Sequence, residues 1–176
     1  KIAILGFGRD GKSVFKFLKK SDPRADIKIL DQKFDKNYLK NLSSFDVIYR
    51  SPGVPYNLPP IQKAIKKGVK FSSATALFFD EAKGKVIGIT GTKGKGTTAT
   101  LLYKILKNAR PERSRRVYLA GNIGKPVIEI LPKLRKNSIV ILELSSFQLQ
   151  DLKKSPDIAV VLDIFNSFVI LFKLKF

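Results

Sequence analysis

The chain has 176 residues, of which 44% are hydrophobic, and this is enough for the core of one large domain or two small ones. Because it contains neither cysteine nor histidine, disulfides, thiolate nucleophiles and the commonest general base are excluded, which leaves carboxylates, lysines, hydroxyls and backbone amides for any chemistry. The formal net charge of +20 attracts phosphate-rich partners, although lysines on solvated helix faces account for most of it.

The first half of the chain alternates short apolar runs with helical spacing. Strands are predicted at residues 2–5, 27–30, 47–49 and 69–71, and helices at 12–19, 38–42 and 61–67. This alternation is typical of parallel strands joined by crossover helices. We therefore expect a Rossmann-like parallel sheet domain over residues 1–83.

The pattern restarts near residue 84. Strands are predicted at 86–90, 117–119, 139–144 and 158–162, and helices at 95–107 and 127–134. Residues 84–176 are therefore expected to form a second α/β domain. The longest apolar stretch, residues 158–172, is interrupted by polar residues and is shorter than the roughly 20 residues that span a bilayer. We interpret it as a buried strand followed by an unusual tail.

A glycine-rich turn links the first predicted strand to the first predicted helix. Its sequence is Gly6-Phe7-Gly8-Arg9-Asp10-Gly11, and Asp31 follows twenty residues after Gly11, at the end of the next strand. Such glycines let a helix amino terminus approach a diphosphate, and the carboxylate is where a ribose ligand is expected. The pattern predicts nucleotide or dinucleotide binding; the alternative is a purely structural turn.

A second loop has stronger phosphate-binding features. A β-branched strand ends at Gly91, and Gly94-Lys95 opens a helix whose free amides and lysine ammonium neutralise phosphates. The Ser or Thr that usually follows the lysine and binds Mg²⁺ is replaced by Gly96, so only a shifted path lets Thr97 take that role. The alternative is a plain Gly/Lys turn. The loop reads Gly91-Thr92-Lys93-Gly94-Lys95-Gly96-Thr97.

One carboxylate completes a predicted buried strand in the second half. Glu143 ends residues 139–143 and precedes Ser145. At the carboxyl end of a parallel strand it lies beside the phosphate loop of a neighbouring strand, where it can hold Mg²⁺ directly or through water. A surface acid, or a cap for the helix at Ser145, is the alternative.

Several sequence strings converge in order and spacing on one family. They are Ser51-Pro52-Gly53-Val54, Gly91-Thr92-Lys93-Gly94-Lys95, Gly121-Asn122-Ile123-Gly124 and Glu143-Leu144-Ser145-Ser146-Phe147-Gln148-Leu149. With these the chain resembles the Mur ligases over residues 1 to about 165. The resemblance implies a Rossmann-like domain followed by an incomplete P-loop ATPase-type α/β domain.

The resemblance also implies roles for individual residues. The first domain then holds the UDP of a sugar-peptide substrate rather than a nicotinamide. The phosphate loop binds ATP through Lys95. Mg²⁺ is held by Glu143 and Thr97. The catalytic residues are Lys95, Asn122 and Glu143. The implied UDP-binding residues are Arg9, Asp10, Asp31, Gln32, Lys33, Ser51, Pro52, Gly53, Asn122 and Ser145.

The implied reaction is ATP-driven amide formation in peptidoglycan precursor synthesis. UDP-N-acetylmuramoyl-L-alanine would be phosphorylated on its carboxylate, and D-glutamate would displace phosphate. The cofactors are ATP and Mg²⁺. The absence of cysteine is compatible with the reducing, cytoplasmic location that we expect, and a monomer without nucleic-acid or membrane partners is expected as well.

Three departures from the family pattern affect these expectations. Gly96 replaces a hydroxyl residue, residues 110–116 are arginine-rich and resemble an inserted loop, and residues 166–176 replace the expected continuation. We expect a trimmed or frame-changed chain without signal peptide that is inactive as a ligase. A non-catalytic UDP-sugar or nucleotide-binding module is the alternative, and a basic nucleic-acid binder ranks last because aromatic interleaving and a recognised motif are missing.

Overall fold

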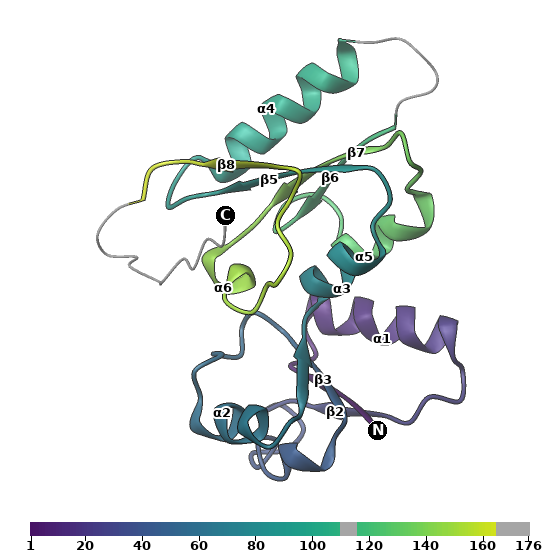
Figure 1. Cartoon of the computed structure of the whole chain (residues 1–176), viewed down its shortest axis with the longest axis vertical. Coiled ribbons are helices and arrows are strands. Elements are labelled where there is room, and N and C mark those ends of the chain that lie inside the picture. Colours follow the sequence, from purple (N-terminus) through teal and green to yellow (C-terminus); the bar gives the residue numbers. More distant parts are fainter. Residues whose placement is uncertain (110–115, 165–176) are drawn as a thin grey trace.

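Two parallel sheets organise the chain, and the computed structural model describes residues 1–109 and 116–164 (Figure 1). The first sheet has the order β2-β1-β3-β4. Its central strand pairs with both neighbours in parallel, and Ile2 lies opposite Ile27 and Val47. The expected Rossmann-like pattern is confirmed. The strands are β1 (Ile2–Leu5), β2 (Ile27–Leu30), β3 (Val47–Arg50) and β4 (Lys70–Ser72).

Helices cover both faces of the first sheet, and the burial of β1 reflects this. Ala3, Ile4 and Leu5 are all fully buried, as expected for a central parallel strand. Ala3 and Leu5 belong to a cluster with α2 (Pro59–Lys66), which begins with proline, and with the 3₁₀ turn η1 (Leu42–Ser44). Ile4 packs on the opposite face with α1 (Arg9–Ser21).

The helix predicted at residues 38–42 is wrong. Turns occupy residues 36–41 and only η1 follows. Side-chain carboxylates compete with helical hydrogen bonding here: Asp31 accepts the Lys33 amide at 2.8 Å and Asp35 accepts the Asn37 amide at 2.7 Å. Asn41 is left-handed, with φ of 60°, and this conformation ends any continuous helix.

The second sheet has the order β6-β7-β5-β8, and all its pairs are parallel. The outer face carries α4 (Lys95–Asn108), whose Ala99 is buried against Ile89 and Ile141. Figure 1 shows α4 on one side of this sheet and α3 and α5 on the other. The strands are β5 (Lys85–Thr90), β6 (Val117–Gly121), β7 (Ile139–Glu143) and β8 (Ile158–Val161).

Two local predictions for this half need correction, and one helix before it was not predicted. The helix predicted at 127–134 is shorter: α5 (Val127–Ile130) gives way to the 3₁₀ turn η2 (Leu131–Lys133), because Pro132 has no amide to donate. The strand predicted as buried, β8, is the sheet edge, and Ile158 and Val161 are exposed by 52% and 46%. The prediction also lacks α3 (Ala74–Glu81), which Ser73 caps by accepting the Ala76 amide.

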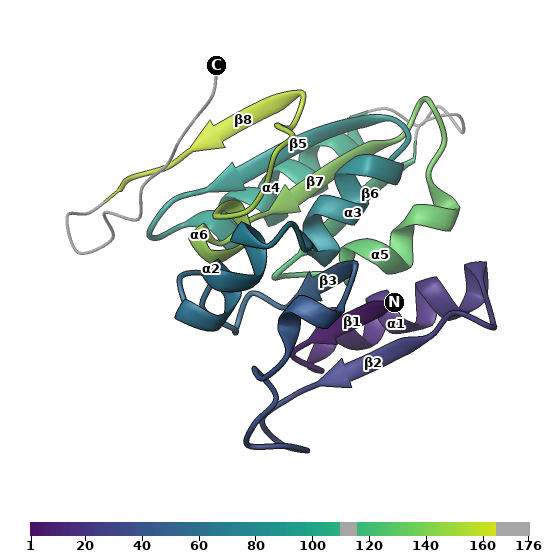
Figure 2. The same ribbon diagram turned by 60° about the horizontal axis from the view of Figure 1, so that its bottom comes forward.

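Helices α1, α3 and α5 lie between the two sheets (Figures 1 and 2). Their apolar side chains form one buried cluster with β1 of the first sheet and β5, β6 and β7 of the second, in which Ile4, Val14, Phe78 and Val140 are essentially inaccessible. The sheets therefore share a helical layer. The domain limits at residues 83 and 84 stay a prediction.

The described residues confirm an α/β fold of two four-stranded parallel sheets. Among them no helix combines the length and apolar character that a bilayer crossing requires. The short helix α6 (Ser146–Leu149) follows β7. Most of the arginine-rich segment, residues 110–115, and the tail from residue 165 lie outside the described residues.

Candidate functional site

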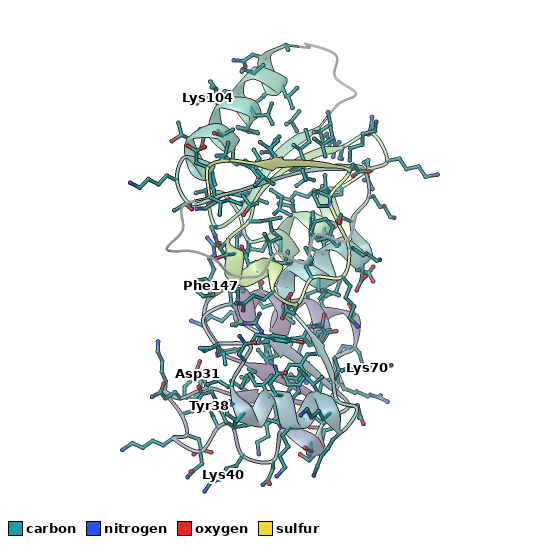
Figure 3. The ribbon with its side chains drawn as sticks, turned by 60° about the vertical axis from the view of Figure 1, so that its left-hand side comes forward. Asp31, Tyr38, Lys40, Lys70, Lys104 and Phe147 are labelled. Carbon is teal, nitrogen blue, oxygen red and sulfur yellow. The ribbon has the colours of Figure 1, made fainter. Side chains whose placement is uncertain are left out.

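A cavity of about 580 Å³ opens at the carboxyl ends of β1, β2 and β3. Ligands of open parallel sheets bind at this edge. Figure 3 shows Asp31 and Tyr38 on the same flank of the first unit. The lining comprises Gly6, Gly8, Arg9, Asp10, Asp31, Gln32, Lys33, Tyr38, Ser51, Pro52, Gly53, Val54 and Asn122.

Asp31 ties together two loops of this cavity. One carboxylate oxygen accepts the Phe7 amide at 2.6 Å and the other accepts the Lys33 amide at 2.8 Å. The hydrogen bond from Phe7, followed by that from Lys33, lowers the pKa of Asp31. The carboxylate thus holds the glycine-rich turn against the β2 loop, and its predicted contact with a ribose would add to this bonding.

The glycine-rich turn is tightly packed. A Cβ on Gly11 would lie 2.2 Å from the carbonyl oxygen of Gly6, so no larger residue lets α1 approach the turn. Gly8 caps α1 without a side-chain hydrogen bond, which leaves the first-turn amides uncovered by a capping side chain. This geometry serves both interpretations of the motif, because it is a tight structural turn and also a suitable anion cradle.

Arg9 brings the second unit to the same cavity. Its guanidinium donates to the carbonyl of Gly121 and, at 3.5 Å, to that of Asn122. Burial raises the pKa of the neighbouring Asp10, and the Arg9 charge opposes that rise. The loop after β6 is thereby fixed beside the amino terminus of α1, and Asn122 becomes part of the cavity wall.

The phosphate loop joins β5 to α4, as predicted. Lys95 is the first residue of α4, and its ammonium donates to the carbonyls of Gly91 at 2.8 Å and Thr92 at 3.0 Å. Gly94 precedes the helix with a left-handed φ of 79°. The ammonium is therefore bound to the loop carbonyls beside the amino terminus of α4, and its role toward a phosphate stays a prediction.

Glu143 lies beside this loop. It pairs with Ile89 in adjacent parallel strands, and residues two apart along a strand share a face, so Glu143 projects on the α4 side with Ile141. The side chain is buried, and among the described residues its Oε2 has no hydrogen-bond partner. The hydroxyl of Thr90, at the end of β5, is also buried without a hydrogen-bond partner among the described residues, but Thr90 follows Ile89 and therefore projects on the opposite face of the sheet from Glu143.

The orphaned Glu143 oxygen suits Mg²⁺, which binds oxygen ligands and usually takes one or two carboxylates together with substrate phosphates and water. The described residues contain no group of three or more acidic side chains that would form a complete protein cage. The donor set therefore fits a cation that arrives with a nucleotide. The structure places Thr97 third in α4, and its predicted metal contact stays a prediction.

The cavity brings together all the predicted UDP-site residues except Ser145. Ser145 instead caps α6: its hydroxyl accepts the Gln148 amide at 3.3 Å, and Gln148 Oε1 accepts the Ser145 amide at 2.9 Å. Binding roles for the gathered residues remain predictions.

Sequence reasoning missed several residues of the site. Tyr38 and Val54 line the cavity, and Thr90 is buried at the phosphate loop. A hydroxyl at the last position of an apolar strand was a usable signal for Thr90. Tyr38 carried no such signal, because it lies in the segment that was wrongly predicted as a helix.

Comparison with known proteins identifies the class first. Residues 89–167 match the Mur ligase middle domain. The chain is thus a relative of the Mur ligases, a family of ligases, and the resemblance seen in the sequence is confirmed.

The similar proteins point to one member. The chain is 34% identical over 182 residues to the UDP-N-acetylmuramoylalanine--D-glutamate ligase of Acetivibrio thermocellus, covering 93% of this chain and 38% of that protein. The enzymes of the same description from Symbiobacterium thermophilum and Oenococcus oeni are 44% identical over 127 residues and 35% identical over 177 residues. These alignments cover 72% and 96% of this chain, and 27% and 39% of the respective proteins. The chain therefore spans less than two-fifths of the length of these relatives.

Proposed function

We propose that this chain provides the UDP-binding unit and part of the ATP-binding unit of a ligase that joins D-glutamate to UDP-N-acetylmuramoyl-L-alanine. The observation that carries the proposal is the cavity after β1, β2 and β3, which gathers Arg9, Lys33 and Ser51 with Asn122 of the second unit. The similarity to D-glutamate ligases over more than nine-tenths of the chain supports the same substrate class.

In this proposal the cavity holds the uridine diphosphate. The amides at the start of α1, together with Arg9 and Lys33, neutralise the diphosphate, and the loops that Asp31 joins enclose the nucleoside. Asn122 then lies where the sugar-peptide end would leave the first unit. The substrate carboxylate would thereby be directed toward the edge of the second sheet.

The second unit would bind ATP along the loop of residues 91–97. Lys95 would turn from the loop carbonyls to the phosphates, and Glu143 and the hydroxyl of Thr97 would hold Mg²⁺, which supplies charge neutralisation. The substrate carboxylate would attack the γ-phosphorus and ADP would leave, which gives an acyl phosphate. The D-glutamate amine would then attack the acyl carbon, and phosphate would depart with the bonding electron pair.

Calorimetry with UDP tests the cavity. We expect the chain to bind UDP, and Lys33→Gln to weaken binding about 5- to 30-fold, because a charge-assisted hydrogen bond contributes about 1–2 kcal/mol. Lys36→Gln is the matched control, since it removes the same charge from the same loop outside the cavity lining. Absence of UDP binding, or equal effects of both substitutions, would contradict the proposal.

A second candidate function is a non-catalytic UDP-sugar or nucleotide-binding module. Its support is the cavity, whose lining gathers Arg9, Lys33 and Ser51 around space for a ligand whether or not a reaction follows binding. We expect the 176 residues alone to bind UDP without D-glutamate-dependent phosphate release from ATP. Turnover in that assay would instead show that these residues suffice for the ligase reaction.

Calorimetric titration with UDP at several salt concentrations also tests the expectation that the chain does not bind nucleic acid. Partners other than the substrates, ATP and Mg²⁺ are not proposed, and we retain a cytoplasmic monomer as a prediction. A nucleic-acid binder would show a steep salt dependence and little preference among nucleotides. Selective UDP binding with a shallow salt dependence is the result that we expect.

A further inference from the structure

Arg50 is a buried cation at the junction of the two units. It ends β3, its side chain is fully inaccessible, and its guanidinium lies 5.3 Å from the ring centre of Tyr56. Nε and Nη2 both donate to Asp151 Oδ2, at 3.0 and 2.9 Å. Arg50 thus directs two donors to one carboxylate oxygen of a residue 101 positions later in the sequence, an ion pair that we call the forked pair, while Asp151 Oδ1 is buried without a partner among the described residues.

The remaining donors of Arg50 bind carbonyls on both sides of the junction. Nη1 donates to Val54 at 2.6 Å and to Ser51 at 3.4 Å, within the turn of residues 51–54, which we call the β3 turn. Nη2 also donates to the carbonyl of Phe147 at 3.2 Å, in residues 144–151, which we call the α6 segment. Figure 1 shows α6 next to the chain that follows β3, and Figure 3 labels Phe147 at this level of the molecule.

Each of these two segments leads to one of the candidate sites. The β3 turn lines the UDP cavity, and the Ser51 hydroxyl donates to the Gly6 carbonyl at 2.7 Å, which ties it to the glycine-rich turn. The α6 segment follows Glu143 directly, and the Leu144 amide donates to Ile89 of β5 at 2.9 Å. Arg50 is therefore a polar connection, besides that of Arg9, between the cavity wall and the strand end that carries the candidate Mg²⁺ ligand.

A connection of this kind does more than hold the units together. Desolvating two charges offsets much of their attraction, so apolar side chains of similar volume would stabilise the junction as well or better. Burial raises the pKa of the Asp151 carboxyl and Arg50 only partly opposes that rise, so the charge of Asp151 depends on this partner. The forked pair fixes the position of the β3 turn relative to the α6 segment, because its hydrogen bonds form only in that one arrangement.

We propose that Arg50 is a positioning residue that transmits occupancy of the cavity to the α6 segment. A uridine diphosphate that orders the β3 turn would fix the positions of the Val54 and Ser51 carbonyls. These carbonyls would in turn fix the guanidinium of Arg50. The guanidinium would then fix its other two partners, Asp151 and the Phe147 carbonyl. The inference rests on the proposed function for UDP binding and adds a physical link between the UDP and ATP sites.

Hydrogen exchange followed by mass spectrometry, with and without UDP, tests this link on the whole chain. In the unsubstituted chain we expect UDP to slow exchange in the β3 turn and also in the α6 segment. Asp151→Asn keeps the volume and removes the charge, so it should abolish the slowing in the α6 segment. Its UDP affinity should fall by about 2- to 30-fold, the range of such coupling effects.

The exposed ion pair between Lys154 and Asp80, with N–O distance 2.7 Å, provides the matched control. Asp80→Asn should leave both the exchange pattern and UDP affinity unchanged, whereas Arg50→Lys, which keeps the charge but loses the fork, should behave like Asp151→Asn. If both junction variants fail to fold, the unsubstituted chain still decides the question. UDP binding without slowed exchange in the α6 segment overturns the coupling alone, and absence of UDP binding overturns the proposed function with it.

Discussion

At the scale of single residues, Asp31 and Glu143 show two uses of a carboxylate at the end of a parallel strand. Asp31 has backbone amides on both oxygens and joins the loops of the cavity. Glu143 is buried with Oε2 free of partners among the described residues, a costly arrangement unless a cation or donor completes it. Asp31 thus organises the cavity, while Glu143 remains available for chemistry.

The state of Asp31 predicts a pH dependence. Its pKa is lower in the folded chain than its ordinary value near 4, so its stabilising contribution is present above that value and disappears as the pH falls through the folded pKa. We expect Asp31→Asn to be less stable than the unsubstituted chain at pH 7, with a gap that closes in acid. Urea unfolding at a series of pH values measures the gap, and a constant difference would contradict this role.

At the scale of elements, the start of α4 and the loop before it determine how this fold could bind a phosphate. The helix begins at Lys95, and its second residue, Gly96, contributes no hydroxyl. The absence of a side chain there has no steric cause, since an added Cβ would lie 3.7 Å from Ile123 in ordinary contact. The glycine therefore weakens the helix without a packing reason and offers no hydroxyl to the proposed metal site.

Substitution of Gly96 separates these two effects. Gly96→Ala should stabilise the chain by about 0.5–1 kcal/mol through helix propensity and leave the Mg²⁺ dependence of ATP binding unchanged. Gly96→Thr should stabilise it less but raise Mg²⁺-dependent ATP affinity roughly tenfold, since about 1.4 kcal/mol from one more ligand corresponds to that factor. Calorimetry with and without Mg²⁺ measures this, and equal affinities for the two variants would exclude a metal-binding hydroxyl at this position.

The sequence predicted the strands and long helices because each carries a clear apolar period. It did not predict α3, whose Ala, Leu and Phe residues are apolar around most of the helix, because the sandwich of two sheets buries it from several sides. The turns at 36–41 were mistaken for a helix because the bond from the Asn37 amide to Asp35, which starts them, is invisible to periodicity. The cavity was largely predicted from its motifs, but the Arg50–Asp151 pair joins residues too distant in sequence to be read as partners.

At the scale of the whole molecule, the helical layer between the sheets couples the folding of the two units. Phe78 of α3 is fully buried in the cluster that both sheets share, and Arg9 and Arg50 cross the same junction with hydrogen bonds. The edge strand β8, by contrast, presents Ile158 and Val161 to solvent. The cluster between the sheets therefore joins the cores of the two units.

Phe78→Ala tests how much the cluster between the sheets contributes to the stability of both units. We expect it to cost about 3–5 kcal/mol, because it removes a large buried ring from a close-packed cluster. Hydrogen exchange should show β1 and β7 losing protection together. Leu101→Ala, at an exposed position of α4, should change stability by no more than about 0.5 kcal/mol. Loss of protection in one sheet alone would show that the units unfold independently.

The central claim is that the cavity at the ends of β1, β2 and β3 binds the uridine diphosphate of the substrate. A crystal structure of the chain with UDP tests it most directly. The account predicts the diphosphate at the first turn of α1, in contact with Arg9 and Lys33, with Ser51 at the wall of the occupied cavity. UDP bound only at the loop of residues 91–97, or no bound nucleotide at saturating concentration, would contradict it.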